Sequence, residues 1–139
     1  MTAFDTDVVS DLFNSVPGVV ARMAALPAAD LYVPIVVAEE VFRGRLDAIR
    51  KAQAGATRFS LEKAYEEFAK SLTDLRQFQT LPYTAAADAL FKAWRTAKVR
   101  IGTQDLRIAA ICLVHGAKLV TRNARDYAQV PGLNLEVWP

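Results

Sequence analysis

The chain has 139 residues, 53% of them hydrophobic, and a formal net charge of +2 at pH 7. A chain of this length builds one hydrophobic core, so we expect a single domain over residues 1–139. The composition excludes a disordered chain, and the single cysteine and single histidine exclude a disulfide framework, a cysteine-rich zinc site and any site that needs two imidazoles. The longest apolar run, residues 108–114, is far shorter than the ~20 residues of a membrane span, so we expect a cytoplasmic protein.

Short apolar runs alternate with longer helical patterns, which favours an α/β domain built on a mostly parallel sheet. A first strand is expected at residues 2–4, and a helix follows from residue 8. Pro17-Gly18 either breaks that helix or starts a second one. Residues 31–36 are rich in β-branched side chains and predict a buried strand, and residues 38–53 have helical spacing.

A further amphipathic helix begins at Leu61. The apolar residues Leu61, Tyr65, Phe68, Leu72 and Leu75 follow one another at steps of 4, 3, 4 and 3 positions. That spacing places them in one stripe along a helix. The stripe packs either into the core of the domain or against a partner.

The last part of the chain predicts three strands, at residues 78–83, 118–121 and 134–137. Pro82 places the first of them at an edge or an end of the sheet. Residues 85–98 have helical spacing. Thr103 is the expected N-cap of another helix, which Gly116 ends.

Charge is segregated along the chain although the net charge is small. Residues 1–31 contain four acidic residues and one basic residue, whereas residues 92–125 contain eight basic residues and one acidic residue. Residues 43–63 contain six basic and two acidic residues. This pattern favours an anionic partner bound beside an acidic centre, against the simpler reading of solvated helix faces.

Motifs for nucleophilic or nucleotide chemistry are absent from the sequence. It contains no G-x-S-x-G elbow, no G-x-x-x-x-G-K-[ST] loop and no G-x-G-x-x-G turn. Cys112 lies between Ile111 and Leu113, so we expect it to be a buried packing residue. His115 ends the same helix, where we expect a surface residue rather than a catalyst.

Carboxylates are the remaining candidates, and they follow the predicted strands. The candidate acids after strands and at helix starts are Asp5, Asp7, Glu39, Glu40, Asp105 and Asp126. The carboxyl ends of parallel strands share one edge, where ligands bind, so these side chains are expected to converge. Their repulsion is relieved by a divalent cation, and oxygen-only ligation suits Mg²⁺ or Mn²⁺ rather than zinc.

These residues carry a resemblance to the PIN-domain ribonucleases of the VapC toxin type, over essentially the whole chain. Four segments match in order: FDTDVVSDL at 4–12, VVAEEVFRGRL at 36–46, RIGTQDLRIAAICLVHGAKLVTRNARDY at 100–127 and VPGLNLEVW at 130–138. The third is the most specific, because it combines a T-x-D helix, a strand and an N-x-x-D turn.

The resemblance implies a three-layer α/β/α sandwich, an endoribonuclease that depends on Mg²⁺ or Mn²⁺, and a homodimer. Carried over by position, the metal ligands and catalytic acids are Asp5, Glu40, Asp105 and Asp126. Glu40 is preferred to Glu39 because the family's glutamate precedes a glycine by four residues, here Gly44. The resemblance implies supporting roles around these acids for Asp7, Thr103 and Asn123. Many relatives carry Asn at the position of Asp7.

The resemblance also implies two partners, RNA and a VapB-type antitoxin. The antitoxin is expected to cover the helical pair at residues 36–78 and the acidic site. RNA backbone is expected at the basic segments, with loops of tRNA or rRNA as substrates. The side chains that we expect to contact RNA are Arg43, Arg45, Arg100, Arg107, Arg122 and Arg125.

Three alternatives remain. One is a PIN-like domain that binds RNA or a partner without cutting. Another is a phosphohydrolase of the haloacid dehalogenase type, whose D-x-D motif Asp5 and Asp7 satisfy. The third is a nuclease with a housekeeping role in RNA processing instead of a toxin.

Overall fold

A computed structural model of the chain describes residues 1–139 and contains five strands. The strands are β1 (Thr2–Phe4), β2 (Leu31–Pro34), β3 (Gln79–Leu81), β4 (Lys118–Thr121) and β5 (Leu135–Val137). They form one sheet in the order β3-β2-β1-β4-β5, and every neighbouring pair is parallel. The predicted α/β fold with a parallel sheet is therefore confirmed, and β3 lies at an edge, where its proline neighbour placed it.

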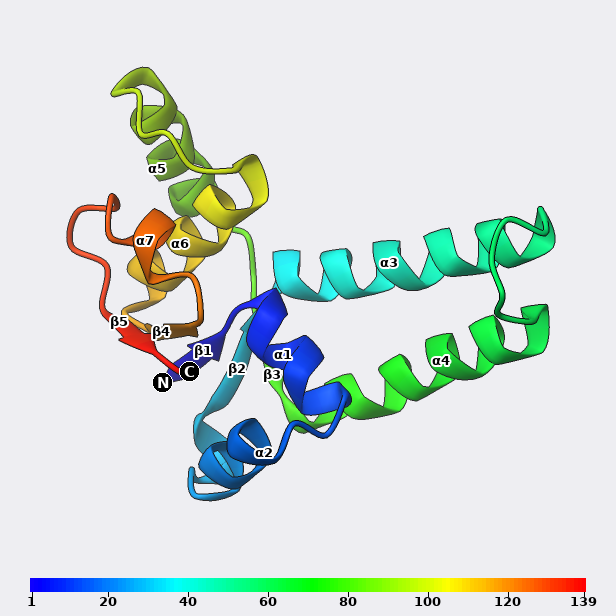
Figure 1. Ribbon diagram of the computed structural model, residues 1–139. Coiled ribbons are helices and arrows are strands. Elements are labelled where there is room, and N and C mark those ends of the chain that lie inside the picture. The colour runs from blue at the N-terminus through cyan, green and yellow to red at the C-terminus, as the bar shows by residue number, and fades with distance from the viewer.

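Seven α-helices connect the strands and cover the sheet (Figure 1). They are α1 (Thr6–Phe13), α2 (Pro17–Ala24), α3 (Ile35–Gln53), α4 (Leu61–Asp74), α5 (Ala85–Thr96), α6 (Thr103–His115) and α7 (Ala124–Tyr127). Two short 3₁₀ turns, Ala28–Asp30 and Leu75–Gln77, lead into β2 and β3. With helices on both faces of the sheet, the domain is a three-layer α/β/α sandwich. None of its helices combines the length and the apolar character that crossing a membrane requires.

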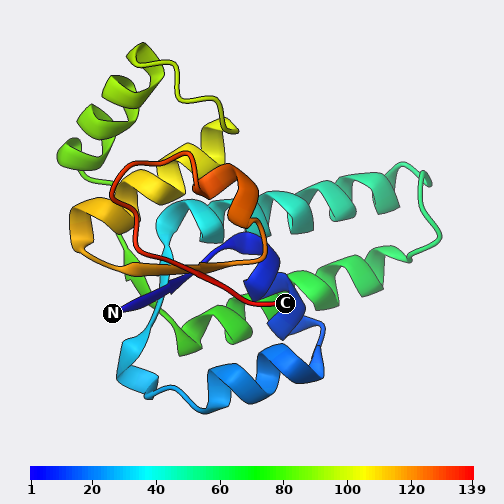
Figure 2. The same ribbon diagram turned by 60° about the vertical axis from the view of Figure 1, so that its left-hand side comes forward.

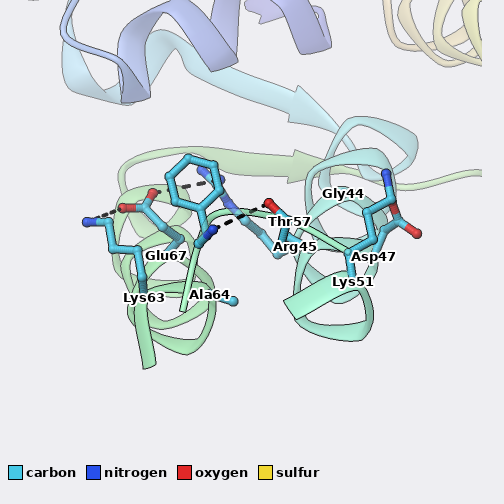
Figure 3. Close-up of a pocket in the computed structure, with 10 residues that line it drawn as sticks. Gly44, Arg45, Asp47, Lys51, Thr57, Lys63, Ala64 and Glu67 are labelled. Atoms are coloured by element: carbon cyan, nitrogen blue, oxygen red, sulfur yellow. Dashed lines mark hydrogen bonds and ion pairs between the residues drawn. The ribbon is translucent and has the colours of Figure 1, made fainter. Parts of the chain in front are cut away.

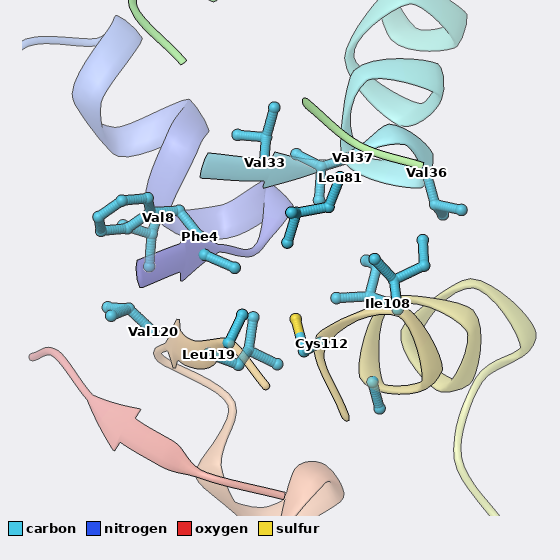
Figure 4. Packing of buried hydrophobic residues seen from close by; sticks show 14 of the residues in the cluster. Phe4, Val8, Val33, Val36, Val37, Leu81, Ile108, Cys112, Leu119 and Val120 are labelled. Atoms are coloured by element: carbon cyan, nitrogen blue, oxygen red, sulfur yellow. The ribbon is translucent and has the colours of Figure 1, made fainter. Parts of the chain in front are cut away.

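The core occupies both faces of the sheet, as the strand register dictates. Phe4 is paired with Val120, and Ala3 with Leu119, so neighbouring strands send these pairs to opposite faces. In Figure 4, Phe4 and Val120 lie on the side of α1, whereas Leu119 faces Cys112 of α6. Cys112 is fully buried, which confirms its expected packing role.

The helices α3 and α4 pack along each other and extend away from the sheet as a helical arm (Figures 1 and 2). Phe42 and Phe68 lie edge to face between them, with ring centroids 5.9 Å apart. Most of the predicted stripe on α4 is nevertheless exposed, including Tyr65 at 49% and Leu72 at 47%. The buried residues of this helix are Ala64 and Ser71, so the helix is rotated relative to the packing that its apolar stripe predicts.

Several predicted boundaries were wrong. The β-branched run at residues 31–36 does not continue as a strand, because α3 begins at Ile35. Val36 and Val37 are buried in its first turn, and burial against the core outweighs their strand preference. Thr103 is not the N-cap of α6: Gly102 occupies that position. The short helix α7 falls in a segment that was interpreted as a turn.

Other predicted ends differ by a few residues. The first helix begins at Thr6 with Asp5 as its N-cap, and Pro17 starts a second helix rather than breaking the first. The strands predicted at 78–83 and 134–137 are shorter, and the helix predicted at 85–98 ends at Thr96. Gly116 has a φ of 66° at the end of α6, which confirms its role as the helix stop.

Candidate active site

The four predicted acids lie at the carboxyl edge of the sheet. Asp5 follows β1, Glu40 lies in α3 directly after β2, and Asp105 is in the first turn of α6. Asp126 lies in α7, which follows β4. Burial is the largest cause of the raised pKa of Asp5, Glu40 and Asp105. The charge of Asp105 adds to the rise at Asp5 and Glu40, and the charge of Asp126 adds to the rise at Asp105. The topology therefore brings the predicted acids into one electrostatically coupled group.

Asp5 is the most deeply fixed of these acids. It is 4% exposed, and as the N-cap of α1 it accepts a hydrogen bond from the Val8 amide at 3.2 Å. Its other oxygen accepts a hydrogen bond from the Thr121 hydroxyl at the end of β4. Burial raises the pKa of Asp5 to about 6, in spite of these two hydrogen bonds, and the negative charges of Asp7 and Asp105 add to the rise.

Glu40 reaches the site from α3. The Thr6 hydroxyl, in the first turn of α1, donates a hydrogen bond to Glu40 Oε1 at 2.6 Å. Partial burial raises the pKa of Glu40, the hydrogen bond from Thr6 opposes the rise, and the charges of Asp105, Glu39 and Asp7 add to it. Thr6, the residue after Asp5, therefore links α1 to Glu40 of α3 by a hydrogen bond.

Asp105 and Asp126 are each held by a neighbour in or next to α7. The hydroxyl of Tyr127, a residue only 1% exposed, donates to Asp105 Oδ1 at 3.3 Å. Asn123 donates through Nδ2 to Asp126 Oδ2 at 2.9 Å. Burial raises the pKa of Asp105, and the hydrogen bond from Tyr127 lowers it in part.

Asp7 acts on more of the site than a peripheral residue would. Its side chain is exposed in the first turn of α1. Burial is the largest cause of the raised pKa of Asp5, Glu40 and Asp105, and the negative charge of Asp7 adds to the rise in all three. We refer to Asp5, Asp7, Glu40, Asp105 and Asp126 together as the acidic centre.

Two acidic-site neighbours do not contact the acids. The hydroxyl of Thr103 accepts a hydrogen bond from the Arg95 guanidinium at 2.9 Å instead. Glu39 points to the other flank of α3, where it accepts hydrogen bonds from Arg43 at 2.5 Å and from Gln104 at 2.8 Å. This arrangement agrees with the choice of Glu40 rather than Glu39 as the acid of the site.

The residues that sequence reasoning missed are Thr6, Thr121 and Tyr127. Each is adjacent to, or two residues from, a residue that was singled out, but a hydroxyl carries no strong motif by itself. Only the fold places Thr121 against Asp5, because the two residues are 116 positions apart. The available signal was position in the sequence: Thr121 ends one predicted strand, Asp5 directly follows another, and the structure pairs these two strands.

The donor set of the acidic centre fits a hard divalent cation. All its candidate ligands are carboxylates, and the only cysteine and histidine lie in α6, where Cys112 is buried and His115 ends the helix. No three of the chain's Asp, Glu, His or Cys side chains lie close enough to form a ready chelating group in this structure. Asp5, Glu40, Asp105 and Asp126 are instead each held by a hydroxyl, amide or backbone donor, so ion binding requires these side chains to turn inward from these bonds.

The predicted RNA-contacting arginines lie in different surroundings. Arg100 and Arg125 are exposed and have no ion pair. Arg122 pairs with Asp11 of α1 at 3.2 Å, and Arg43 pairs with Glu39. Arg45 lies inside the helical arm, where its Nε donates to Ser71 Oγ at 2.8 Å. Arg107 donates to Gln104 at 3.0 Å, so the structure leaves two of the six free at the surface and gives the other four protein partners with charged or polar groups.

A groove extends from the acidic centre into the helical arm. Glu40, Thr6 and Arg45 line a pocket of about 270 Å³ between α1 and α3. The groove continues between α3 and α4 as a pocket of about 510 Å³ (Figure 3). Lys63 and Glu67 form an ion pair at 3.1 Å on its α4 side, and Phe59 beside it is 66% exposed.

Comparison with known protein families matches residues 3–133 to the PIN domain model. A ribonuclease, VapC1 of Rickettsia felis, is 32% identical over 75 residues. That match covers 52% of this chain and 53% of the relative, so the similarity spans about half of each protein.

Solved structures share the fold over nearly the whole chain. The VapBC2 structure of Rickettsia felis, bound to a DNA fragment from its promoter, has a TM-score of 0.79 at 21% identity and covers 99% of this chain and 98% of its own. The DNA-bound VapBC of Salmonella typhimurium has a TM-score of 0.77 at 17% identity, with 100% of both chains covered. FitAcB of Neisseria gonorrhoeae has a TM-score of 0.74 at 20% identity and covers 100% of this chain and 97% of its own.

Proposed function

Because this chain belongs to the PIN domain family, we propose that it is an endoribonuclease that depends on Mg²⁺ or Mn²⁺ and acts as the toxin of a toxin–antitoxin pair in the cytoplasm. The observation that carries the proposal is the acidic centre, in which burial, together with the charges of neighbouring carboxylates, raises the pKa of Asp5, Glu40 and Asp105. Carboxylates gathered at a cost in repulsion are a feature of sites built for chemistry.

The metal, when bound, would polarise a phosphodiester and lower the pKa of a water molecule. Asp5, Glu40, Asp105 and Asp126 would hold it, with Asp7 as a further oxygen donor. Thr6, Thr121 and Tyr127 bond to three of these carboxylates through their hydroxyl groups, and these carboxylates would have to turn from those bonds to share one ion.

RNA would approach over the basic surface next to these acids. Arg100 and Arg125, which have no ion pair, are the best placed to contact phosphates, and Arg122 can exchange Asp11 for a phosphate. Arg45 is less suited, because it is bonded inside the helical arm. Binding that relies on such contacts weakens steeply as salt concentration rises.

The helical arm would receive the antitoxin. A similar structure from Klebsiella pneumoniae is a toxin–antitoxin complex, and others are VapBC2 of Rickettsia felis and FitAcB of Neisseria gonorrhoeae. In this chain the arm exposes Leu46, Phe59, Tyr65 and Leu72, beside the groove that leads to Glu40. An apolar segment of a VapB-type antitoxin would cover this face and send a basic side chain to the acids. We further propose that the toxin forms a homodimer.

The decisive experiment is digestion of total cellular RNA by the purified chain, free of any copurified partner. Reactions contain Mg²⁺, Mn²⁺ or EDTA, and the Asp5→Asn variant is tested beside the wild type. Discrete fragments that require the metal and disappear in the variant support the proposal, and the mapped ends identify the target. The Glu66→Gln variant, which removes an exposed carboxylate from the helical arm, is the matched control.

The alternatives predict different results. Intact RNA in every lane, with RNA retained in a binding assay, points to a PIN-like domain that binds without cutting. Hydrolysis of a simple phosphomonoester would favour a phosphohydrolase with Asp5 as nucleophile, although both oxygens of Asp5 accept hydrogen bonds and the residue is 4% exposed. Growth arrest on expression, relieved by a neighbouring gene, separates a toxin from a housekeeping nuclease.

A further inference from the structure

A second pocket lies beside the acidic centre and has no part in the function proposed above. Its volume is about 360 Å³, and its lining residues are Ile35, Val36, Glu39, Tyr83, Asp88 and Arg107. It shares α3 and α6 with the acidic centre: Glu39 precedes Glu40, and Gln104, which bonds to Glu39, precedes Asp105. A ligand in this pocket would therefore lie next to the phosphate on which the acidic centre would act.

Arg107 is held in place before any ligand arrives. Its guanidinium carbon lies 4.8 Å from the centre of the Phe91 ring, and its NH1 donates to Gln104 Oε1 at 3.0 Å. A guanidinium has five N–H donors in a planar fork, and Gln104 uses one of them. The remaining donors form a fixed group at the wall of the pocket.

The same pocket also contains hydrogen-bond acceptors. Asp88 accepts from the Tyr83 hydroxyl at 2.9 Å and pairs with Lys92 at 2.8 Å, so its charge is supported in the absence of a ligand. A carboxylate has about four acceptor sites, so Asp88 can accept further bonds. The Tyr83 side chain and the apolar Ile35 and Val36 supply the other walls.

This combination of donors and acceptors suits one nucleobase best. Guanine presents two acceptors, O6 and N7, on one edge and two donor groups, N1–H and N2–H₂, on another. Adenine places a donor at N6 where guanine has the O6 acceptor, so it would turn a donor toward the guanidinium. Aromatic side chains next to such groups commonly flank unpaired RNA bases.

We propose that this pocket binds a guanine base of single-stranded RNA, with Arg107 donating to O6 and N7 and Asp88 accepting from N1–H and N2–H₂. The inference rests on the proposed function, since it assigns the base beside the phosphate that the acidic centre would cleave. It changes the role expected for Arg107 from backbone contact to base recognition.

Binding is measured first, in EDTA so that no cleavage occurs. The probes are fluorescent oligouridylates with one central guanosine, adenosine, inosine or 7-deazaguanosine, and the readout is fluorescence anisotropy. One bidentate arginine contact predicts about tenfold tighter binding of the guanosine probe than of the adenosine probe. The 7-deazaguanosine probe, which lacks N7, loses most of this preference.

The variants assign the preference to residues. Arg107→Lys keeps the charge but not the fork, so the guanosine and adenosine probes should bind within about twofold of each other. Asp88→Asn should remove the preference for guanosine over inosine, which lacks the N2 amino group, while leaving the N7 effect in place. Arg76→Gln, which removes a charge from an exposed arginine after α4, should keep the full preference.

Cleavage separates this inference from the proposed function. Metal-dependent cutting with equal binding of the guanosine and adenosine probes overturns the guanine assignment and leaves the nuclease intact. Guanosine preference that depends on Arg107, in a protein that cuts no RNA, supports the pocket and overturns the proposed function. A preference that Arg107→Lys does not change also overturns the assignment.

Discussion

The acidic centre and the helical arm are both left unsatisfied by the fold, but in opposite ways. In the acidic centre every side chain except that of Asp7 is buried or half-buried and hydrogen-bonded, and burial together with repulsion between the charges is the unfavourable term. In the helical arm the apolar side chains of Leu46, Phe59, Tyr65 and Leu72 are exposed. The first region is suited to an ion and a phosphate, and the second to a protein segment. The same helix, α3, passes from one region to the other, since it carries Glu40 and Leu46.

The largest effect is expected from charge removal in the acidic centre. Asp5→Asn and Asp105→Asn should each lower metal-dependent RNA cleavage by about 100-fold or more, because each takes a fixed oxygen donor from the site. The melting temperature should stay the same or rise, since repulsion is relieved. Cleavage rates and thermal melts of the same preparations check both parts. Full activity in either variant would contradict the site assignment.

The next effect is a dependence of stability on pH. Asp5 has a pKa of about 6 in the folded chain, above its ordinary value of 3.8, so the folded state binds its proton more tightly than the unfolded chain does. As the pH rises from about 4 to 6, the folded state loses this advantage, and the free energy of unfolding should fall on the order of 2–3 kcal/mol. Urea unfolding across this range measures the decrease.

The comparison for that measurement is Asp5→Asn, which cannot titrate. The difference between wild type and variant isolates Asp5 from carboxylates with lowered pKa values, such as Asp30 with its N-terminal ammonium partner. If the difference in the free energy of unfolding between wild type and variant stays constant with pH, burial does not raise the pKa of Asp5.

A smaller effect tests the contact between Tyr127 and Asp105. Tyr127→Phe keeps the buried ring and removes only the hydroxyl, so about 1 kcal/mol of stability should be lost with the hydrogen bond. The same change should raise the pKa of Asp105 further, because that hydrogen bond lowers it. Calorimetric titration with Mn²⁺ should show weaker binding. If the variant is less stable but binds Mn²⁺ as tightly as the wild type, Tyr127 contributes to the stability of the fold and not to ion binding.

The smallest effect on stability is expected in the helical arm. Tyr65→Ser replaces a side chain that is 49% exposed and should change the free energy of unfolding by no more than about 0.5 kcal/mol. Binding of the antitoxin, by contrast, should weaken measurably in a pull-down from the native host. Phe68→Ala on the same helix is the matched variant, since Phe68 packs on Phe42 and its loss should cost stability. Equal effects of the two changes on the free energy of unfolding would contradict the description of the Tyr65 side chain as exposed and uncovered.

The sequence predicts most of the sheet and the edge at which the acidic residues lie, because the carboxyl ends of parallel strands share one edge. The choice of four acids came from the family resemblance and stays a prediction. Asp5 and Asp126 follow apolar runs that match β1 and β4 closely. The N-cap expected at Thr103 was wrong, since Gly102 occupies that position and the Thr103 hydroxyl accepts a hydrogen bond from Arg95, which depends on how α5 packs. The hydrogen bond from Tyr127 to Asp105 and the exposure of Tyr65 depend on helix rotation, which spacing alone does not determine.

The hydrogen bond between Asp5 and Thr121 also determines when the acidic centre forms. The two residues are 116 positions apart, and β1 pairs with β4 across the same interval. Contacts of such long sequence separation form late in folding, because a long loop must close first. A nascent chain on the ribosome contains Asp5 and Glu40 long before it contains Asp105, Asp126 or the strand beside β1. A chain interrupted before residue 105 therefore contains only part of the acidic centre, and under the proposed function it should cut no RNA.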